Sequence, residues 1–454
     1  MTRERWAKAV WIATALWVCV MVGSLRYGWL DRFFFDTSQA QVQGIDFFPV
    51  ERGWLNLVDG RSEFDTFHST YGPHATWLLY HPALAVVVGP LLMAFSPWTA
   101  YGAWTGIALV MMAVAAWLVM RTGTDPLRRA LVALLMMGSF PTFLMLHVGN
   151  VQALLVLAVV LVLAAFISIQ QEGSTRRNQA MLLAGLLMSL LSKPVVLVML
   201  PLLVLLPETR RTALKALGIY IVVSLLFLVV PGLNPEAISW TQRGELATHP
   251  AIVTQTMNVY TNGFVVTPPM KDNSIHWLAM LGLADYRFLH IDVYSLPVLM
   301  DGWLRVHTPD ALYRIPGVLL LGLTVLVGFM REKRDRLEAA LMTLMAASLL
   351  AFLSYGLVWE YHFTAVMPLA GIFLMRGAMG RFERAVVAMG VVVWLPSLYV
   401  LMAGKDLSLL SVQTMLHAER VVPVVVIFCL LVYRAARIAL VSKGGLRFVA
   451  ASSE

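Results

Sequence analysis

The chain has 454 residues, of which 59% are hydrophobic and only 13% are charged. Soluble domains have about 45–50% apolar and about 25% charged residues, so this composition excludes an ordinary soluble protein. The apolar runs are far longer than barrel strands, and we therefore expect an all-α polytopic membrane protein. The net charge of +8 comes from basic residues in short loops, where they set membrane orientation rather than bind nucleic acid.

The first apolar run, residues 8–28, is too long for the core of a signal peptide and is followed by no small-residue cleavage pattern. We therefore predict that it is the first span. Arg3, Arg5 and Lys8 precede or begin it, which indicates a cytoplasmic N-terminus. Cys19 and Cys429 lie inside apolar runs and indicate neither a disulfide nor thiol chemistry.

The loop after this span, about residues 29–76, gathers seven acidic residues among aromatic ones. They are Asp31, Asp36, Asp46, Glu51, Asp59, Glu63 and Asp65. Asp46 precedes Phe47 and Phe48 at the start of a predicted amphipathic segment. A carboxylate beside apolar rings is partly desolvated, which suits a general base. Any of the seven acids could take that role, and most exposed acids are only solvated.

Residues 77–97 are apolar but are interrupted by Pro82, Gly89, Pro90 and Pro97. If this segment crossed the membrane, every later basic cluster would fall outside, against the usual distribution. We therefore predict that it lies along the outer leaflet or dips into it. Backbone of this kind is tolerated where protein covers it.

The remaining runs predict eleven more spans, which makes about twelve helices with both termini cytoplasmic, in one domain covering residues 1–454. The predicted spans are 99–120, 130–147, 150–169, 179–193, 194–207, 213–231, 311–330, 338–358, 362–376, 385–403 and 420–440. Two outer loops, about 29–98 and 232–310, follow from this topology. The two spans that meet at Lys193 are short and are predicted to form a hairpin.

Ionisable and amide groups at membrane depth are candidates for function because burying them in hydrocarbon is costly. Lys193 could bind a phosphate, or it could simply extend its ammonium to the headgroups. Asn150 and Gln152 could bind sugar hydroxyls, although capping of the following helix explains Asn150 equally well. Glu360, Tyr361 and His362 could bind sugar or phosphate, or belong to an interfacial aromatic belt.

Other chemistries have weak support in the sequence. There is no H-E-x-x-H motif, no paired cysteine motif and no His/Asp cluster at ligand spacing, so a structural zinc site is not expected. There is also no P-loop and no G-x-G-x-x-G, so no nucleotide-binding domain is expected. A donor carried on a lipid would need no such domain.

With these residues in view, the chain resembles the GT-C membrane glycosyltransferases, most closely glycosyltransferase family 87, which includes polyprenol-phosphate-mannose-dependent mannosyltransferases. Ordered short motifs carry the resemblance over most of the chain. They are Asp46-Phe47-Phe48 followed by Trp54, Leu55 and Gly60, then Tyr80-His81-Pro82, Gly89-Pro90-Leu91, Gly149-Asn150-Val151-Gln152, Lys193-Pro194 and Tyr361-His362-Phe363. Two details depart from the family pattern: His81 replaces a proline, and the two amides of the fourth motif are exchanged.

The resemblance implies an inverting transferase in the cell membrane that moves a mannose-like pentose or hexose from a polyprenyl-phosphate donor to a lipid or glycan acceptor outside. It implies Asp46 as the base and Lys193, His362, Asn150 and Gln152 as donor ligands. Tyr361 and Glu360 are further donor candidates, and Glu51, Tyr80 and Asn258 are candidates for acceptor or loop contacts. No cofactor is expected beyond the lipid-linked donor, and assistance by a divalent metal stays open.

Two other classes of protein remain open at this stage. A transporter or flippase would use the same polar groups as a substrate path, although the chain shows no inverted repeat. A polysaccharide polymerase or ligase would also act on lipid-linked sugars outside, and scattered arginines occur in the predicted outer loops.

Overall fold

The computed structural model describes residues 2–30, 33, 43–58, 80–229, 295–304, 310–354, 358–376, 379–397 and 410–441. These residues form helices, with no β-strand among them. In chain order the helices are α1 (Arg3–Tyr27), α2 (Phe48–Val58), α3 (Pro82–Leu92), α4 (Pro97–Met120), α5 (Pro126–Met137), α6 (Phe140–Val148), α7 (Gln152–Glu172), α8 (Arg176–Leu190), η3 (Val195–Met199), α9 (Leu200–Leu205), α10 (Arg210–Val229), η5 (Val298–Trp303), α14 (Asp310–Tyr313), α15 (Ile315–Gly328), α16 (Lys333–Ala347), α17 (Leu350–Ser354), η6 (Glu360–Ala365), α18 (Val366–Met375), α19 (Arg381–Trp394) and α20 (Leu410–Val441).

Four of the described helical segments are long and apolar enough to cross a membrane. They are Arg3–Tyr27, Pro97–Met120, Gln152–Glu172 and Thr414–Val441. A fifth span results if α5 and α6, which meet at a bend of 40°, are counted together. The chain is therefore a helical membrane protein, as its composition predicts, and these four segments coincide with predicted spans.

The count of about twelve full-length spans is not confirmed. Several apolar runs that hydropathy treats as one helix are divided into shorter pieces. The predicted span 130–147 is interrupted at Gly138 and Ser139, and Ser139 starts α6 by accepting a hydrogen bond from the Thr142 amide. The predicted span 362–376 begins as the tight helix η6 before α18 follows. Hydropathy averages over such breaks because capping residues hardly change the mean.

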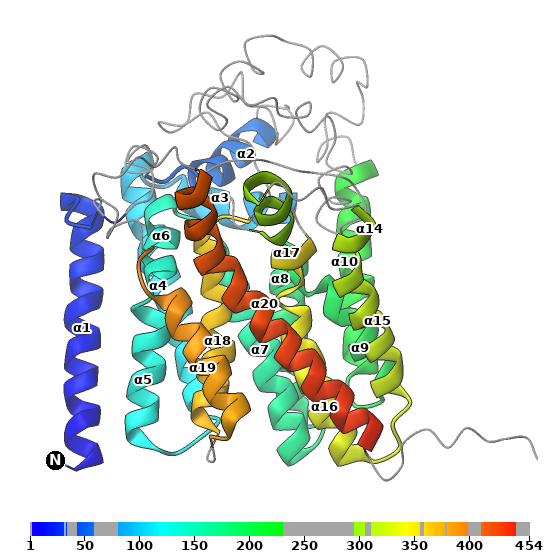
Figure 1. Ribbon diagram of the computed structural model, residues 1–454. Helices are drawn as coiled ribbons and strands as arrows, with labels where there is room; N and C mark the ends of the chain where they lie inside the picture. Colours follow the sequence, from blue (N-terminus) through cyan, green and yellow to red (C-terminus); the bar gives the residue numbers. More distant parts are fainter. Residues whose placement is uncertain are drawn as a thin grey trace, which may run out of the picture.

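α7 occupies the middle of the bundle and packs against α4, α8 and α16 (Figure 1). Its residues are apolar nearly all round, which is typical of a helix enclosed by other helices. α8 approaches α7 closely at Gly185, where an added Cβ would lie 2.7 Å from the Ala158 carbonyl oxygen. The helix that begins with Gln152 is thus held by packing along its length.

The segment around Lys193 forms the predicted hairpin. α8 ends at Leu190, η3 begins at Val195, and the chain then returns through α9. The two arms meet again at their far ends, where the Gln179 side chain donates to the Glu208 carbonyl oxygen at 2.9 Å. α3 has 11 residues, well short of the roughly 20 needed to cross a bilayer, in agreement with the prediction for residues 77–97.

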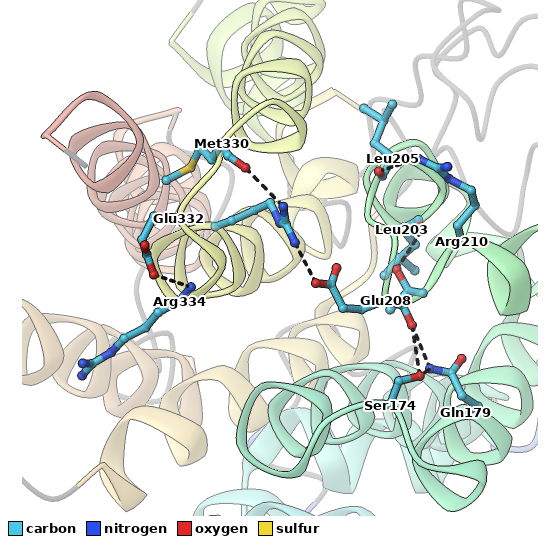
Figure 2. A network of polar contacts seen from close by, with 11 residues as sticks. Ser174, Gln179, Leu203, Leu205, Glu208, Arg210, Met330, Glu332 and Arg334 are labelled. Carbon is cyan, nitrogen blue, oxygen red and sulfur yellow. Dashed lines mark hydrogen bonds and ion pairs between the residues drawn. The ribbon is translucent and has the colours of Figure 1, made fainter. Parts of the chain in front are cut away.

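The bundle has two ends that differ in their polar contacts. We call the end that carries α2 and α3 the α2 end, and the end where α1 begins the opposite end (Figure 1). At the opposite end the Arg336 guanidinium pairs with the Glu208 carboxylate at 2.7 Å and donates to the Met330 carbonyl oxygen. Figure 2 shows how Ser174 and Gln179 of the hairpin converge on the Glu208 backbone.

Candidate functional site

The turn that carries Asp46 is attached to the C-terminal end of α6. The Gly44 amide donates to the His147 carbonyl oxygen and the Asp46 amide to the Val148 carbonyl oxygen, both at 2.9 Å. The last carbonyls of a helix have no partner within the helix. Here the loop supplies those partners, so the ending of α6 determines where the Asp46 backbone lies.

Gly149 permits this close approach. Its φ of +68° is left-handed, and an added Cβ would lie 2.6 Å from the Phe47 Cβ. The Tyr101 hydroxyl donates to the carbonyl oxygens of Leu146 and His147, and the Trp104 indole donates to the Gly149 carbonyl oxygen. Side chains of α4 therefore complete the same junction, and Phe47 packs against them.

Asn150 connects the start of α7 to Asp46. Its Oδ1 accepts from the Gln152 amide at 2.8 Å, which caps the helix. Its Nδ2 donates to the Asp46 carboxylate at 2.9 Å and to the Tyr80 hydroxyl at 3.0 Å. The two interpretations left open for Asn150 are thus both present in one side chain: the oxygen caps, and the nitrogen orients a carboxylate and a phenol.

Lys193 faces His362 from the tip of the hairpin. The Lys193 Nζ and His362 Nε2 atoms are 3.0 Å apart. On the other side of the ring, Nδ1 lies 2.9 Å from the Trp359 amide nitrogen and 3.2 Å from the Trp359 carbonyl oxygen. A backbone amide can only donate, so the shorter contact favours the tautomer with its hydrogen on Nε2. In that tautomer the Lys193 ammonium and the Nε2–H group face each other as two donors, an arrangement that an anion accepting from both would stabilise.

Tyr361 and Gln152 join these two groups. The Tyr361 side chain hydrogen-bonds to Asp46, and its ring lies 4.5 Å from the His362 ring centroid. The Gln152 amide nitrogen lies 3.4 Å from the His362 carbonyl oxygen, and its buried Oε1 has no hydrogen-bond partner. An acceptor is therefore available beside the converging donors, in a position to bind a hydroxyl group.

Asp46, Lys193 and His362 are half-buried, whereas Tyr80, Asn150 and Gln152 around them are buried. Burial raises the pKa of the Asp46 carboxyl, and hydrogen bonds from Asn150 and Tyr361 and the charge of Lys193 oppose that rise. A carboxylate with a raised pKa is a stronger base than one in water. The arrangement can therefore accept a proton on one side and bind an anion on the other.

Glu360, Glu51 and Asn258 are the remaining predicted residues. Glu360 is buried and its carboxylate pairs with the Arg420 guanidinium. Glu51 is fully buried on α2, so it is not a solvated acid. Asn258 lies outside the described residues, as do the acidic loop positions Asp31, Asp36, Asp59, Glu63 and Asp65.

Sequence reasoning did not identify Arg420. It is 1% exposed on α20, it pairs with Glu360, and it donates to the Val393 carbonyl oxygen at 3.0 Å. A signal was available, because a lone arginine beside Glu419 opens the apolar run of residues 421–432. An ionisable residue at that depth needs a partner, and Glu360 is one.

Comparisons of the chain with protein-family models, with curated proteins and with solved structures found no match. Within the described residues, no three His, Cys, Asp or Glu side chains gather in a way that could hold a metal ion. What the site can do is therefore inferred from its own groups: a carboxylate, an ammonium, an imidazole, two phenols and two amides.

Proposed function

We propose that the chain is an inverting membrane glycosyltransferase of the GT-C kind, which transfers a mannose-like sugar from a polyprenyl-phosphate donor to a hydroxyl of a lipid or glycan acceptor. One observation carries the proposal. A half-buried carboxylate, Asp46, is held by Asn150 and Tyr361 in the same cluster as the converging N–H groups of Lys193 and His362. This pairing of a base with an anion site is what sugar transfer from a phosphate requires.

In the proposed reaction, Asp46 accepts the proton of the acceptor hydroxyl as its oxygen attacks the anomeric carbon. The bond between that carbon and the phosphate oxygen breaks, and polyprenyl phosphate leaves with the electron pair. General-base assistance of this kind contributes about 10²–10⁴-fold. Lys193 and His362 stabilise the negative charge that develops on the leaving phosphate, where charged donors are most effective.

The distribution of charge supports a location of the site on the outer face of the cell membrane. Arg3, Arg128 and Arg336 lie at the opposite end of the bundle, together with their partners Asp125 and Glu208. Positive residues favour the cytoplasmic side. We therefore place both termini in the cytoplasm and the α2 end outside.

We further propose a bundle of about twelve helices in which the α8–α9 hairpin does not reach the outer surface. α8 has 15 residues and spans about 22 Å, less than the roughly 30 Å thickness of the hydrocarbon core. Lys193 would then lie below the outer surface, at the depth of a lipid phosphate drawn into the bundle. In this proposal the divided helices, such as α5 with α6 and η6 with α18, each complete one crossing.

Purified protein supplied with a polyprenyl-phosphate sugar and an acceptor tests the proposal by release of polyprenyl phosphate. Asp46→Asn should lower turnover by at least about 10²-fold, because the amide cannot accept the proton, while donor binding persists. Asp125→Asn makes the same change at the cap of α5, where Asn serves as well as Asp. That control should keep normal turnover.

Three results would contradict the proposal. The first is normal turnover in Asp46→Asn. The second is movement of a lipid-linked or anionic substrate across liposomes without bond cleavage, which would identify a transporter or flippase. The third is growth or transfer of a preassembled glycan chain, which would identify a polymerase or ligase.

A further inference from the structure

The turn that presents Tyr361 and His362 begins at Glu360, and Glu360 is anchored by Arg420. Both side chains are almost completely buried, at 4% and 1% exposure. The Arg420 guanidinium pairs with the Glu360 carboxylate through one nitrogen and donates to the Val393 carbonyl oxygen through another. Arg420 thereby connects the first residue of η6 to the last turn of α19 and to its own helix, α20.

The other polar contacts of this turn are of a different kind. The contacts between His362 and Trp359 are local and set the ring orientation within the turn. The contact from Gln152 to the His362 carbonyl oxygen is long, at 3.4 Å. A charged bridge to two packed helices constrains the position of the turn far more strongly than these contacts do.

A buried ion pair needs a reason beyond stability, since apolar residues of similar volume often replace such pairs without loss of stability. Here the two residues that follow Glu360 reach opposite sides of the cluster. Tyr361 hydrogen-bonds to Asp46, and His362 lies against Lys193. A small rotation of the turn would disturb both contacts together.

We infer that the Arg420–Glu360 pair is a positioning device, which holds the turn so that Tyr361 meets Asp46 while His362 meets Lys193. The inference rests on the proposed function. Neither residue touches the reacting atoms; both act through their neighbours in the chain. Glu360 thereby has a role other than donor binding, and Arg420 joins the residues on which the reaction depends.

The test replaces both charges at once, with Glu360→Leu and Arg420→Met in one chain, so that neither member of this pair is left buried without the other; the neighbouring Glu419, 3.8 Å from the Arg420 guanidinium, is less buried. This double variant should elute as a single folded species but lose roughly 10- to 100-fold in kcat, the effect of misplacing groups by about 1 Å. The control is Glu338→Leu with Arg376→Met, which makes the same two changes in a half-buried pair at the opposite end. The control should keep the native kcat.

The pH profile separates positioning from a general loss of stability. The charged and titratable groups that face Asp46 are Tyr361 from η6, Lys193 from the hairpin tip and Tyr80 before α3. Losing the Tyr361 hydrogen bond raises the pKa of Asp46, so the acid limb of kcat/KM should move to higher pH in the double variant. Tyr361→Phe alone should move it likewise, and adding it to the double variant should move it no further.

A cross-linking measurement reports on position without depending on activity. Lys193→Cys with His362→Cys, in a background where Cys19 and Cys429 are replaced by Ser, should cross-link through a short reagent when Arg420 and Glu360 are present. The double variant should cross-link much less. Undiminished cross-linking together with native kcat and a native acid limb would overturn the inference. If the wild-type chain releases no polyprenyl phosphate and the double variant still loses cross-linking, the proposed function fails and the positioning role stands.

Discussion

The two ends of the bundle handle charge in opposite ways. At the opposite end two carboxylates pair with guanidinium groups: Glu208 with Arg336, and Glu338 with Arg376. At the α2 end, the cation Lys193 faces an imidazole, and within the described residues it makes no ion pair. At the opposite end these charges neutralise each other, whereas at the α2 end the Arg420–Glu360 pair is closed and Lys193 remains available to a ligand.

This difference distinguishes polar groups that stabilise the fold from polar groups that could bind a ligand. The Glu208 network connects the far ends of the hairpin to α16 (Figure 2). The Glu208 and Arg336 charges pair with each other, while Glu208 Oε2 and Arg336 Nε have no hydrogen-bond partner. The α2 end brings two donors together beside an unpartnered acceptor, Gln152 Oε1. The distinction therefore rests on Lys193, whose charge has no carboxylate partner among the described residues, whereas the Glu208 and Arg336 charges are paired.

The largest effect that would sharpen this comparison is expected from Lys193→Met. Removing a charged hydrogen-bond donor costs about 1.5–3 kcal/mol, so donor affinity should fall roughly 10- to 100-fold. Titration of a polyprenyl-phosphate sugar against the purified protein measures the change. Lys333→Met, which removes an exposed lysine at the opposite end, should leave affinity unchanged. Equal losses in both variants would contradict the division between the two ends.

The next largest effect is expected from Gly149→Ala. Left-handed backbone costs a non-glycine residue roughly 1–2 kcal/mol, and the new methyl group would also overlap Phe47. The Asp46 turn should shift, lowering both the melting temperature and turnover. Gly173 provides the matched control because its φ is also positive, at +84°, but nothing lies within 4 Å of an added Cβ.

Gly173→Ala should therefore lower the melting temperature modestly and leave turnover unchanged. If both glycine variants lost turnover alike, the effect would come from general destabilisation. If neither did, the Phe47 packing would not determine the position of Asp46.

Much of the candidate site could be anticipated from the sequence. Polar residues that interrupt apolar runs are conspicuous, and this pattern identifies Asn150, Lys193 and His362. Asp46 is one of seven acids in its loop, and only its apolar neighbours and the family resemblance distinguish it. Their chemistry also limited what they could do. Successive spans cross the membrane in opposite directions, which predicts that these residues meet at one end of the bundle. This step depends on topology rather than on exact helix boundaries.

Two features of the structure could not be predicted from the sequence. The division of apolar runs into shorter helices depends on local capping, as at Ser139, which hydropathy does not register. The role of Glu360 depends on the rotation of α20, which brings Arg420 inward. The direction in which Arg420 points depends on the elements that pack against α20, and its partner Glu360 lies 60 residues away in the sequence.

A smaller effect is expected on the pH profile. Because burial raises the pKa of Asp46 and a base must be ionised to act, kcat/KM should fall with decreasing pH at values above the usual aspartate range near 4. Asn150→Ser keeps a capping oxygen for α7 but loses the amide donor to Asp46. The acid limb should then move to still higher pH, with little change in the alkaline plateau.

An acid limb that stays in place in Asn150→Ser would show that Asn150 does not act on the Asp46 carboxylate. A limb that moves to lower pH would contradict the sign of the argument, since removing a donor can only disfavour the ionised form. Thermal unfolding of the variant should match that of the wild type, because the cap is retained.

The smallest effect on turnover is expected at the Glu208–Arg336 pair. Glu208→Leu with Arg336→Met removes the two charges together, and apolar replacement of a buried pair often leaves stability nearly unchanged, so turnover should stay within about twofold of the wild type. Arg336→Gln alone leaves the Glu208 carboxylate buried without its cation and should lower the melting temperature while donor affinity persists. A loss of turnover in the double variant comparable to that of Lys193→Met would mean that the hairpin transmits changes from its far ends to its tip. The opposite end would then belong to the functional machinery, and the separation between the two ends would fail.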